Sequence, residues 1–229
     1  MKNNKVHAWV SVIISAIFFF YWFIQLSLNN TLIEFYIDRY KLISYGSFTA
    51  MYLIGNVVMF IPAGVISDKY KSKYIISSAL LIMIICIGLM IISRNTIIAY
   101  ICMLLIGFSG AFTMISCVKV SMKWFSDNSI ALPVSICISI AFLGGYCGNV
   151  VGRHILDTFN SGVAVQVSNL IVGVLILLIT FIFMKEPYLN NSDTVKKSIK
   201  TEITLAGKLL FKKQNWAQSL FPLDGLNLL

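Results

Sequence analysis

The sequence predicts an all-α integral membrane protein with six transmembrane helices, and three observations support this prediction. The chain has 229 residues, of which 58% are hydrophobic and only 12% charged, and its mean hydropathy is +0.85. A soluble domain of this size cannot bury so much apolar surface. The apolar residues form continuous runs of about 20 residues, as in membrane-spanning helices, and not the alternating segments of about 10 residues found in transmembrane barrels. Polar connectors separate these runs, which indicates repeated membrane crossings.

The apolar runs place the six expected spans at residues 8–28, 44–66, 74–92, 96–118, 130–152 and 163–184. The first run exceeds the roughly 7–15 apolar residues of a signal peptide, and no small-residue cleavage site follows it, so we expect it to remain as the first span. Short connectors join the spans, apart from the longer one at residues 29–43.

Residues 185–229 form a polar tail, which we expect to be a linker on the cytoplasmic side. Pro187 would end the last span, because proline cannot continue a helix. Residues 203–211 are apolar with lysines nearby, and two interpretations stay open: a short amphipathic helix on the membrane surface, or plain linker.

The distribution of basic residues predicts the orientation, because cytoplasmic loops carry an excess of Lys and Arg. With the N-terminus inside, the inside segments hold 14 of the 18 Lys and Arg residues, and they hold 7 against 4 when the tail is left out. Both termini are therefore expected in the cytoplasm, with the spans in a bacterial inner membrane. Topology and contact with the anionic headgroups of the lipid bilayer account for the net charge of +9, so no nucleic-acid partner is expected.

The sequence carries no pattern typical of an enzyme or a metal site. The five cysteines all lie in apolar runs without metal-ligand spacing, which favours buried packing residues over disulfides or ligands. No Gly-x-x-x-x-Gly-Lys, His-Glu-x-x-His or Gly-x-Ser-x-Gly motif occurs, and no pair of acids lies inside the spans. We therefore expect a protein that is not an enzyme and that has no cofactor or metal.

The most informative segment is the charged connector Gly64–Lys73, Gly-Val-Ile-Ser-Asp-Lys-Tyr-Lys-Ser-Lys, between the second and third spans. An ordinary positively charged turn explains its lysines, but it does not explain Asp68. The connector resembles the loop between helices 2 and 3 of major facilitator superfamily transporters, whose pattern is Gly-x-x-x-Asp-Arg/Lys-x-Gly-Arg/Lys-Arg/Lys. Four residues match this pattern, and Lys71 and Ser72 depart from it; the matching residues are Gly64, Asp68, Lys69 and Lys73.

The resemblance implies a role for Asp68 as a conformational latch. In the family, this acid interacts with a helix N-terminus in the second half of the transporter and with basic residues near the end of helix 4. A carboxylate is stabilised there by the positive end of the helix dipole. Lys123 is the basic neighbour that we expect within this chain.

The fourth and fifth spans extend the resemblance. Residues 116–125 resemble the end of family helix 4, where a base and a Trp-Phe pair precede a short cytoplasmic loop. Gly144, Gly148 and Gly152 fall four apart on one helix face, which predicts a packing seam where a neighbouring helix approaches closely and slides. The Gly-Pro core of the family's antiporter signature is missing, so we do not infer antiport.

Polar residues inside the spans are candidates for a substrate path, because lipid penalises them. The candidates are Tyr21, Gln25, Tyr52, Asn56, Ser116, Lys119 and Asn149. For each Tyr, Asn and Gln, hydrogen bonding between helices is the alternative role. For Lys119, the alternative is an ammonium group that extends to the inner membrane interface.

The resemblance covers about Trp9 to Trp216 and implies the N-terminal six-helix half of a secondary transporter. Such a transporter moves a small organic solute by rocker-switch alternating access, with symport of H⁺ or Na⁺ as the expected coupling. Three hypotheses stay open for the chain itself: a truncated transporter that is inactive alone, a half that pairs with itself or with a separate second half, and a non-transporting scaffold or regulatory subunit.

Overall fold

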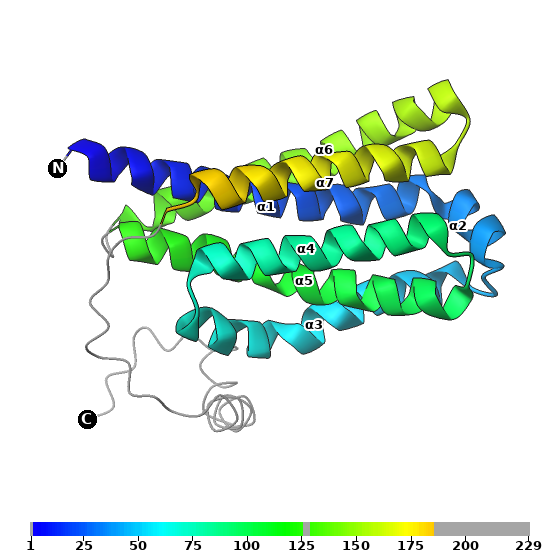
Figure 1. Cartoon of the computed structure of the whole chain (residues 1–229), viewed down its shortest axis with the longest axis horizontal. Helices are drawn as coiled ribbons and strands as arrows, with labels where there is room; N and C mark the ends of the chain where they lie inside the picture. Colours follow the sequence, from blue (N-terminus) through cyan, green and yellow to red (C-terminus); the bar gives the residue numbers. More distant parts are fainter. Residues whose placement is uncertain (1, 126–128, 186–229) are drawn as a thin grey trace, which may run out of the picture. The chain divides into compact units, whose positions relative to one another are not determined.

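The computed structural model describes residues 2–125 and 129–185, and within these ranges it contains seven helices and no strand (Figure 1). The helices are α1 (Lys2–Thr31), α2 (Ile33–Tyr40), α3 (Tyr45–Lys69), α4 (Ser72–Ile92), α5 (Thr96–Trp124), α6 (Ala131–Phe159) and α7 (Gly162–Phe183). All except α2 are long and apolar enough to cross a membrane. This confirms the predicted all-α membrane fold with six spans. The expected tail and the segment 203–211 lie outside the described residues, apart from Lys185.

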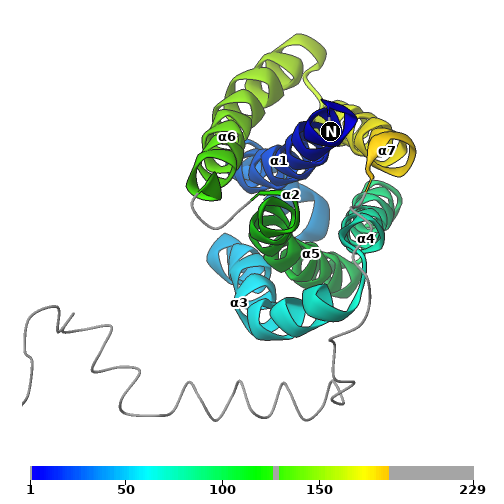
Figure 2. The ribbon, with the colours of Figure 1, turned by 90° about the vertical axis from the view of Figure 1, so that its left-hand side faces the viewer.

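The six long helices form a bundle around α1 and α5. Figure 2 shows these two helices near the middle, and they are also the most buried spans. α1 packs along α6, α5 packs along α3, and α4 contacts both α5 and α7. α3 and α6 are the least buried spans, so much of their apolar surface remains available to lipid or to a partner.

The four-residue sequence Gly-Asn-Val-Val occurs twice, at 55–58 in α3 and at 148–151 in α6. A Cβ at Gly55 would collide with the backbone of Leu104 in α5, and a Cβ at Gly148 would lie 3.0 Å from the Cα of Ile24 in α1. The six spans divide into a first group, α1, α3 and α4, and a second group, α5, α6 and α7. In each group the second span packs against the first span of the other group: α3 packs against α5, and α6 packs against α1. This arrangement is that of two related three-helix repeats, a plan found in secondary transporters.

The glycines of the predicted seam on α6 all face α1. A Cβ at Gly144 would collide with the carbonyl oxygen of Phe20, and one at Gly152 would collide with the side chain of Leu28. A second close contact, which the sequence analysis did not predict, joins α3 and α5 where Gly107 meets the carbonyl of Tyr52. Small residues allow this close backbone approach inside a membrane.

The bundle has two ends, and we name them by what lies there. The N-terminal end holds the start of α1, the α3–α4 connection and the end of α7, at the left of Figure 1. The α2 end holds α2 and the connections α4–α5 and α6–α7, at the right of the same view.

The structure corrects the expectation that Gly64–Lys73 is a loop. α3 continues through Asp68 and Lys69, and only Tyr70 and Lys71 connect it to α4. The helical hydrogen bonds continue to this point, since the amide of Tyr70 still donates to the carbonyl of Ile66, at 3.1 Å. Pro62 lies inside α3 and not at its end, so the carbonyl one turn earlier loses its usual helical donor.

The connector at 29–43 contains the short helix α2, which the apolar runs did not predict. Leu32, Tyr36 and Tyr40 are buried and spaced four residues apart, so they form one apolar stripe along this segment. The charged residues Glu34 and Asp38 lie on its exposed side. α2 is therefore an amphipathic helix that covers one end of the bundle.

Candidate functional site

An ion pair between Asp68 at the end of α3 and Lys119 near the end of α5 joins two packed helices at the N-terminal end. The Asp68 side chain is 64% exposed and that of Lys119 24% exposed. The expected partner Lys123 lies one turn further along α5, and its ammonium donates instead to the hydroxyl of Ser72 in α4, at 3.0 Å. The basic neighbour of Asp68 is thus Lys119, because α3 and α5 place that turn of α5 beside the carboxylate.

This ion pair is suited to opening and closing. Exposed ion pairs contribute only about 0.2–1 kcal/mol, because water solvates both charges when they separate. The pair also explains where the Lys119 ammonium lies: it is held at the end of the bundle and not in its centre.

The three other residues of the matched pattern lie on α3 and α4. The ammonium of Lys73 lies 4.8 Å from the centre of the Phe181 ring, a cation–π contact that links α4 to α7. A Cβ at Gly64 would meet no atom of the described residues within 4 Å, so packing inside this bundle does not require a glycine there. Lys69 is exposed at the last residue of α3.

A cluster of uncharged polar groups lies between α1 and α7. The side-chain amides of Gln25 and Asn169 exchange two hydrogen bonds, at 2.7 and 3.0 Å, and the hydroxyl of Tyr21 donates to the backbone carbonyl of Asn169, at 3.1 Å. All three side chains are buried. Of the predicted path residues, Tyr21 and Gln25 are brought together here, and their polar groups are occupied by bonds between helices.

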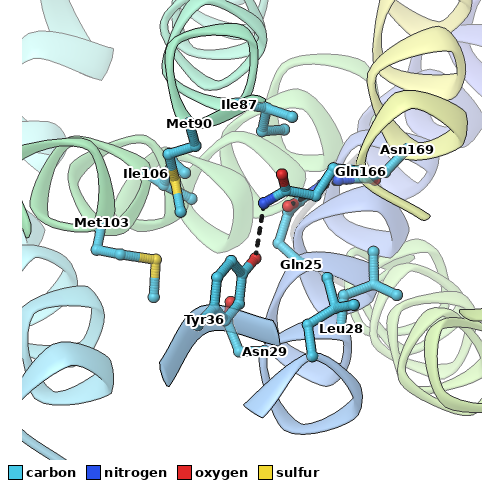
Figure 3. Close-up of a pocket in the computed structure, with 11 residues that line it drawn as sticks. Gln25, Leu28, Asn29, Tyr36, Ile87, Met90, Met103, Ile106, Gln166 and Asn169 are labelled. Atoms are coloured by element: carbon cyan, nitrogen blue, oxygen red, sulfur yellow. Dashed lines mark hydrogen bonds between the residues drawn. The ribbon is translucent and has the colours of Figure 1, made fainter. Parts of the chain in front are cut away.

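The cluster continues toward the α2 end through Gln166 and Tyr36. The Gln166 amide donates to the Tyr36 hydroxyl, at 3.3 Å (Figure 3). Beside them lies a cavity of about 10 Å³, formed by residues of α1, α2, α4, α5 and α7. This volume is far too small for an organic solute, so in this conformation the cavity is not a solute site.

The remaining path candidates are spread over the bundle. Tyr52 stacks on Trp22 with ring centres 5.6 Å apart, and its hydroxyl donates to the Trp22 carbonyl. Ser116 is buried, and its hydroxyl has no hydrogen-bond partner among the described residues. Asn56 on α3 is half-buried and Asn149 on α6 is exposed. These two asparagines are the second residues of the repeated Gly-Asn-Val-Val sequence.

Hydrogen bonds from α2 attach this helix to the end of α4. The Tyr40 hydroxyl donates to the carbonyl of Met90, at 2.6 Å, and the Arg39 guanidinium donates to the carbonyl of Ile91. These are among the last carbonyls of α4, which have no partner within their own helix, and a cation is favoured at this helix end. Burial raises the pKa of Tyr40, which keeps its hydroxyl protonated as a donor.

Several of these residues escaped sequence reasoning although a signal existed. Gln166 and Asn169 are polar residues inside the sixth span, so the rule that selected Gln25 also applies to them. Tyr36 could have been found from the four-residue spacing of its buried stripe. Arg39 had no comparable signal, because its role depends on where α4 ends.

Comparison with known proteins identifies the family. The sequence profile of the Major Facilitator Superfamily matches residues 8–223, which is most of the chain. No curated protein matches the sequence closely enough to count as a relative. Members of this superfamily are membrane transporters and not enzymes. The profile match agrees with the six-span bundle, and this chain belongs to the Major Facilitator Superfamily.

Proposed function

We propose that the chain forms the N-terminal helix bundle of a secondary transporter that moves a small organic solute by alternating access, coupled to H⁺ or Na⁺ by symport. The observation that carries this proposal is the Asp68–Lys119 ion pair, formed at a water-exposed helix end. Alternating access requires contacts at one end that exist in one state and separate in the other. The Asp68 carboxylate is 64% exposed, so it can exchange Lys119 for water or for a donor of the second half at small cost.

The charge distribution supports a cytoplasmic N-terminal end. Lysines cluster there, and the α2 end has fewer basic residues; the lysines are Lys69, Lys71, Lys73, Lys119 and Lys123. Cytoplasmic segments carry this excess in bacterial inner-membrane proteins. Labelling single cysteines in intact cells with a membrane-impermeant maleimide tests the orientation. Lys71→Cys should be protected and Arg94→Cys should react.

Among the predicted path residues, we propose Asn56 and Asn149 as the solute contacts. They lie on α3 and α6, the least buried spans, at equivalent positions of the two repeats. Tyr21, Gln25 and Tyr52 are buried and already donate to groups of neighbouring helices. Asn149 is exposed, and its amide makes two long bonds of 3.4 Å, accepting from Thr31 and donating to the carbonyl of Gly145. An asparagine amide offers both a donor and an acceptor without charge, which favours a polar solute bound by hydrogen bonds.

The bundle would work with a second six-helix half or with a second copy of itself. α3 and α6 present exposed apolar side chains such as Val57, Phe60, Phe142 and Tyr146. Crosslinking in native membranes from cysteines at Val57 and Phe142 should yield one specific adduct. A chain that stays monomeric under these conditions contradicts the pairing.

The transport proposal is tested in cells that express the protein. Accumulation of isotope-labelled solutes from a mixed medium should change when the wild type is expressed together with a second six-helix half, and Asp68→Asn in this pair should lower that change several-fold. Asp157→Asn is the matched control, because Asp157 is an exposed acid at the other end of the bundle. Both variants should insert into the membrane normally.

Two results would contradict the proposal. One is equal accumulation in cells with the wild type and with Asp68→Asn. The other is an equal loss from both substitutions, which would show a general effect of removing an acid. A charge exchange, Asp68→Lys with Lys119→Asp, should recover part of the activity that either single change removes.

A further inference from the structure

The buried amide of Gln166, between α2 and α7, has only part of its hydrogen-bonding capacity satisfied. Its nitrogen donates to the Tyr36 hydroxyl, whereas its oxygen Oε1 has no partner among the described residues. The residue is only 3% exposed, so bulk water does not reach the oxygen. Turning the amide over exchanges its two ends, but the Tyr36 hydroxyl can serve only one of them. One buried polar atom therefore needs another partner.

A cavity adjoins this amide. It has about 10 Å³ of free volume, and Gln25, Asn29, Tyr36 and Gln166 line it together with Met90 and Met103. Figure 3 shows the Gln166 oxygen directed away from Tyr36, on the side of Ile87. A buried water requires about 10–15 Å³ of such space and two to four polar partners. Both conditions are met at this site.

We propose that this cavity binds a single water molecule, which accepts a hydrogen bond from the Tyr36 hydroxyl and donates one to Oε1 of Gln166. The amide of Asn29, which lines the same cavity, is the third partner. Burial raises the pKa of Tyr36 above its usual value, so this hydroxyl keeps the proton that it donates. The water connects α1, α2 and α7 through one hydrogen-bonded group.

The chemistry of the lining favours water over a cation of similar size. None of the residues that line the cavity is acidic. A cation in this apolar surrounding would lack an opposite charge, and its desolvation would not be compensated. A water molecule carries no such penalty and satisfies the same oxygen.

Radiolytic hydroxyl-radical footprinting of the purified full chain, read by mass spectrometry, tests the proposal. Met90 and Met103 are 2% and 1% exposed, so their oxidation reports water inside the protein and not at its surface. Both should be oxidised in the wild type. Gln166→Leu should lower the oxidation several-fold, because it removes the amide and fills the space with carbon atoms. Tyr36→Phe should also lower it while keeping the ring that packs in the core.

Thr180→Val is the matched control, since it removes a buried polar group of α7 whose hydroxyl donates within its own helix, to Ile176. This variant should leave the oxidation of both methionines unchanged. Equal oxidation in the wild type, Gln166→Leu and Tyr36→Phe overturns the proposal, as does unreactive Met90 and Met103 in the wild type. If Gln166→Leu does not fold, Tyr36→Phe decides.

Replacement of Na⁺ by choline in the buffer distinguishes a bound water molecule from a bound cation. Oxidation of Met90 and Met103 should be the same in both salts. A saturable dependence on Na⁺ would identify a bound cation and would overturn the assignment of water. No step of this experiment requires transport, so its outcome is independent of the proposed function.

Discussion

The two ends of the bundle are held together by different chemistry. At the N-terminal end, charged side chains join the helices: Asp68 pairs with Lys119, and Lys123 donates to Ser72. At the α2 end, buried groups donate mainly to uncharged acceptors, as in the bonds from Gln166 to Tyr36 and from Tyr40 to the last turn of α4. The Asp68 carboxylate of the first set is mostly exposed to water, whereas Tyr36, Tyr40 and Gln166 of the second set are buried.

This difference indicates which end can move. An exposed ion pair that opens exchanges its partner for water, so the net cost is small. A buried hydrogen bond that opens leaves a polar atom unsatisfied, at about 1–3 kcal/mol. We infer that the α2 end keeps the helices together as one body, whereas contacts at the N-terminal end separate and re-form.

The largest effect is expected from Gly144→Ala, between the two ends. The new Cβ would collide with the carbonyl oxygen of Phe20, so α6 must move away from α1. Overpacking of this kind costs about 1–3 kcal/mol. Denaturant titration of the purified protein in detergent measures the loss. Gly88→Ala is the control, because a Cβ there meets no atom of the described part of the chain within 4 Å. Equal effects of the two changes would show that the seam does not determine the packing.

A similar effect is expected when either partner of the amide pair near the α2 end is removed. Gln25→Leu or Asn169→Leu alone leaves the other amide buried without its partner, which costs about 1–3 kcal/mol. The double variant removes both polar groups and should be less destabilised than the sum of the two. A double-mutant cycle on the unfolding free energy measures this coupling. Strict additivity would show that the two amides do not depend on each other.

Tyr40→Phe should lower the unfolding free energy by about 1 kcal/mol, since it removes the hydrogen bond to Met90 and keeps the ring. Tyr70→Phe is the matched control at the N-terminal end, where that tyrosine is 55% exposed. The control should be neutral. If both substitutions are neutral, the hydrogen bond from Tyr40 to Met90 does not contribute to the stability of the bundle.

The smallest effect on stability is expected at the ion pair itself. Asp68→Asn should change the unfolding free energy by less than about 1 kcal/mol, because the carboxylate is mostly exposed. The difference should vanish near 1 M salt, where charges are screened beyond about 3 Å. The effect of Tyr40→Phe should not depend on salt. If Asp68→Asn instead lowers the unfolding free energy by a large amount that does not depend on salt, the two ends of the bundle do not differ in the way proposed.

The sequence alone was sufficient to predict the six spans, because a bilayer requires long apolar runs that no other fold class needs. It was also sufficient to select Asp68, because the excess of basic residues in cytoplasmic loops explains the lysines of this segment but not an acid. The partner of Asp68 was not predictable, since Lys119 and Lys123 lie on the same helix one turn apart. Only the packing of α3 against α5 distinguishes them.

The residues around Gln166 could have been selected by their polarity inside the spans, but their role was not predictable from the sequence. A polar residue in a span can line a solute path or join two helices, and the pattern of residues is the same in both cases. The structure brings Tyr21, Gln25 and Asn169 into mutual contact, which favours the second role for these side chains. The helix α2 was not predictable from the length of apolar runs, because its eight residues are too few for a span.

Pro62 gives α3 a mechanical property that the other spans do not share. It lies inside the helix, six residues before Asp68, and provides no N–H for the carbonyl one turn earlier. Bending of a helix concentrates at such a missing bond. A bend of α3 at Pro62 would therefore move the last two turns of the helix, and it would displace Asp68 near their end more than the residues next to the proline.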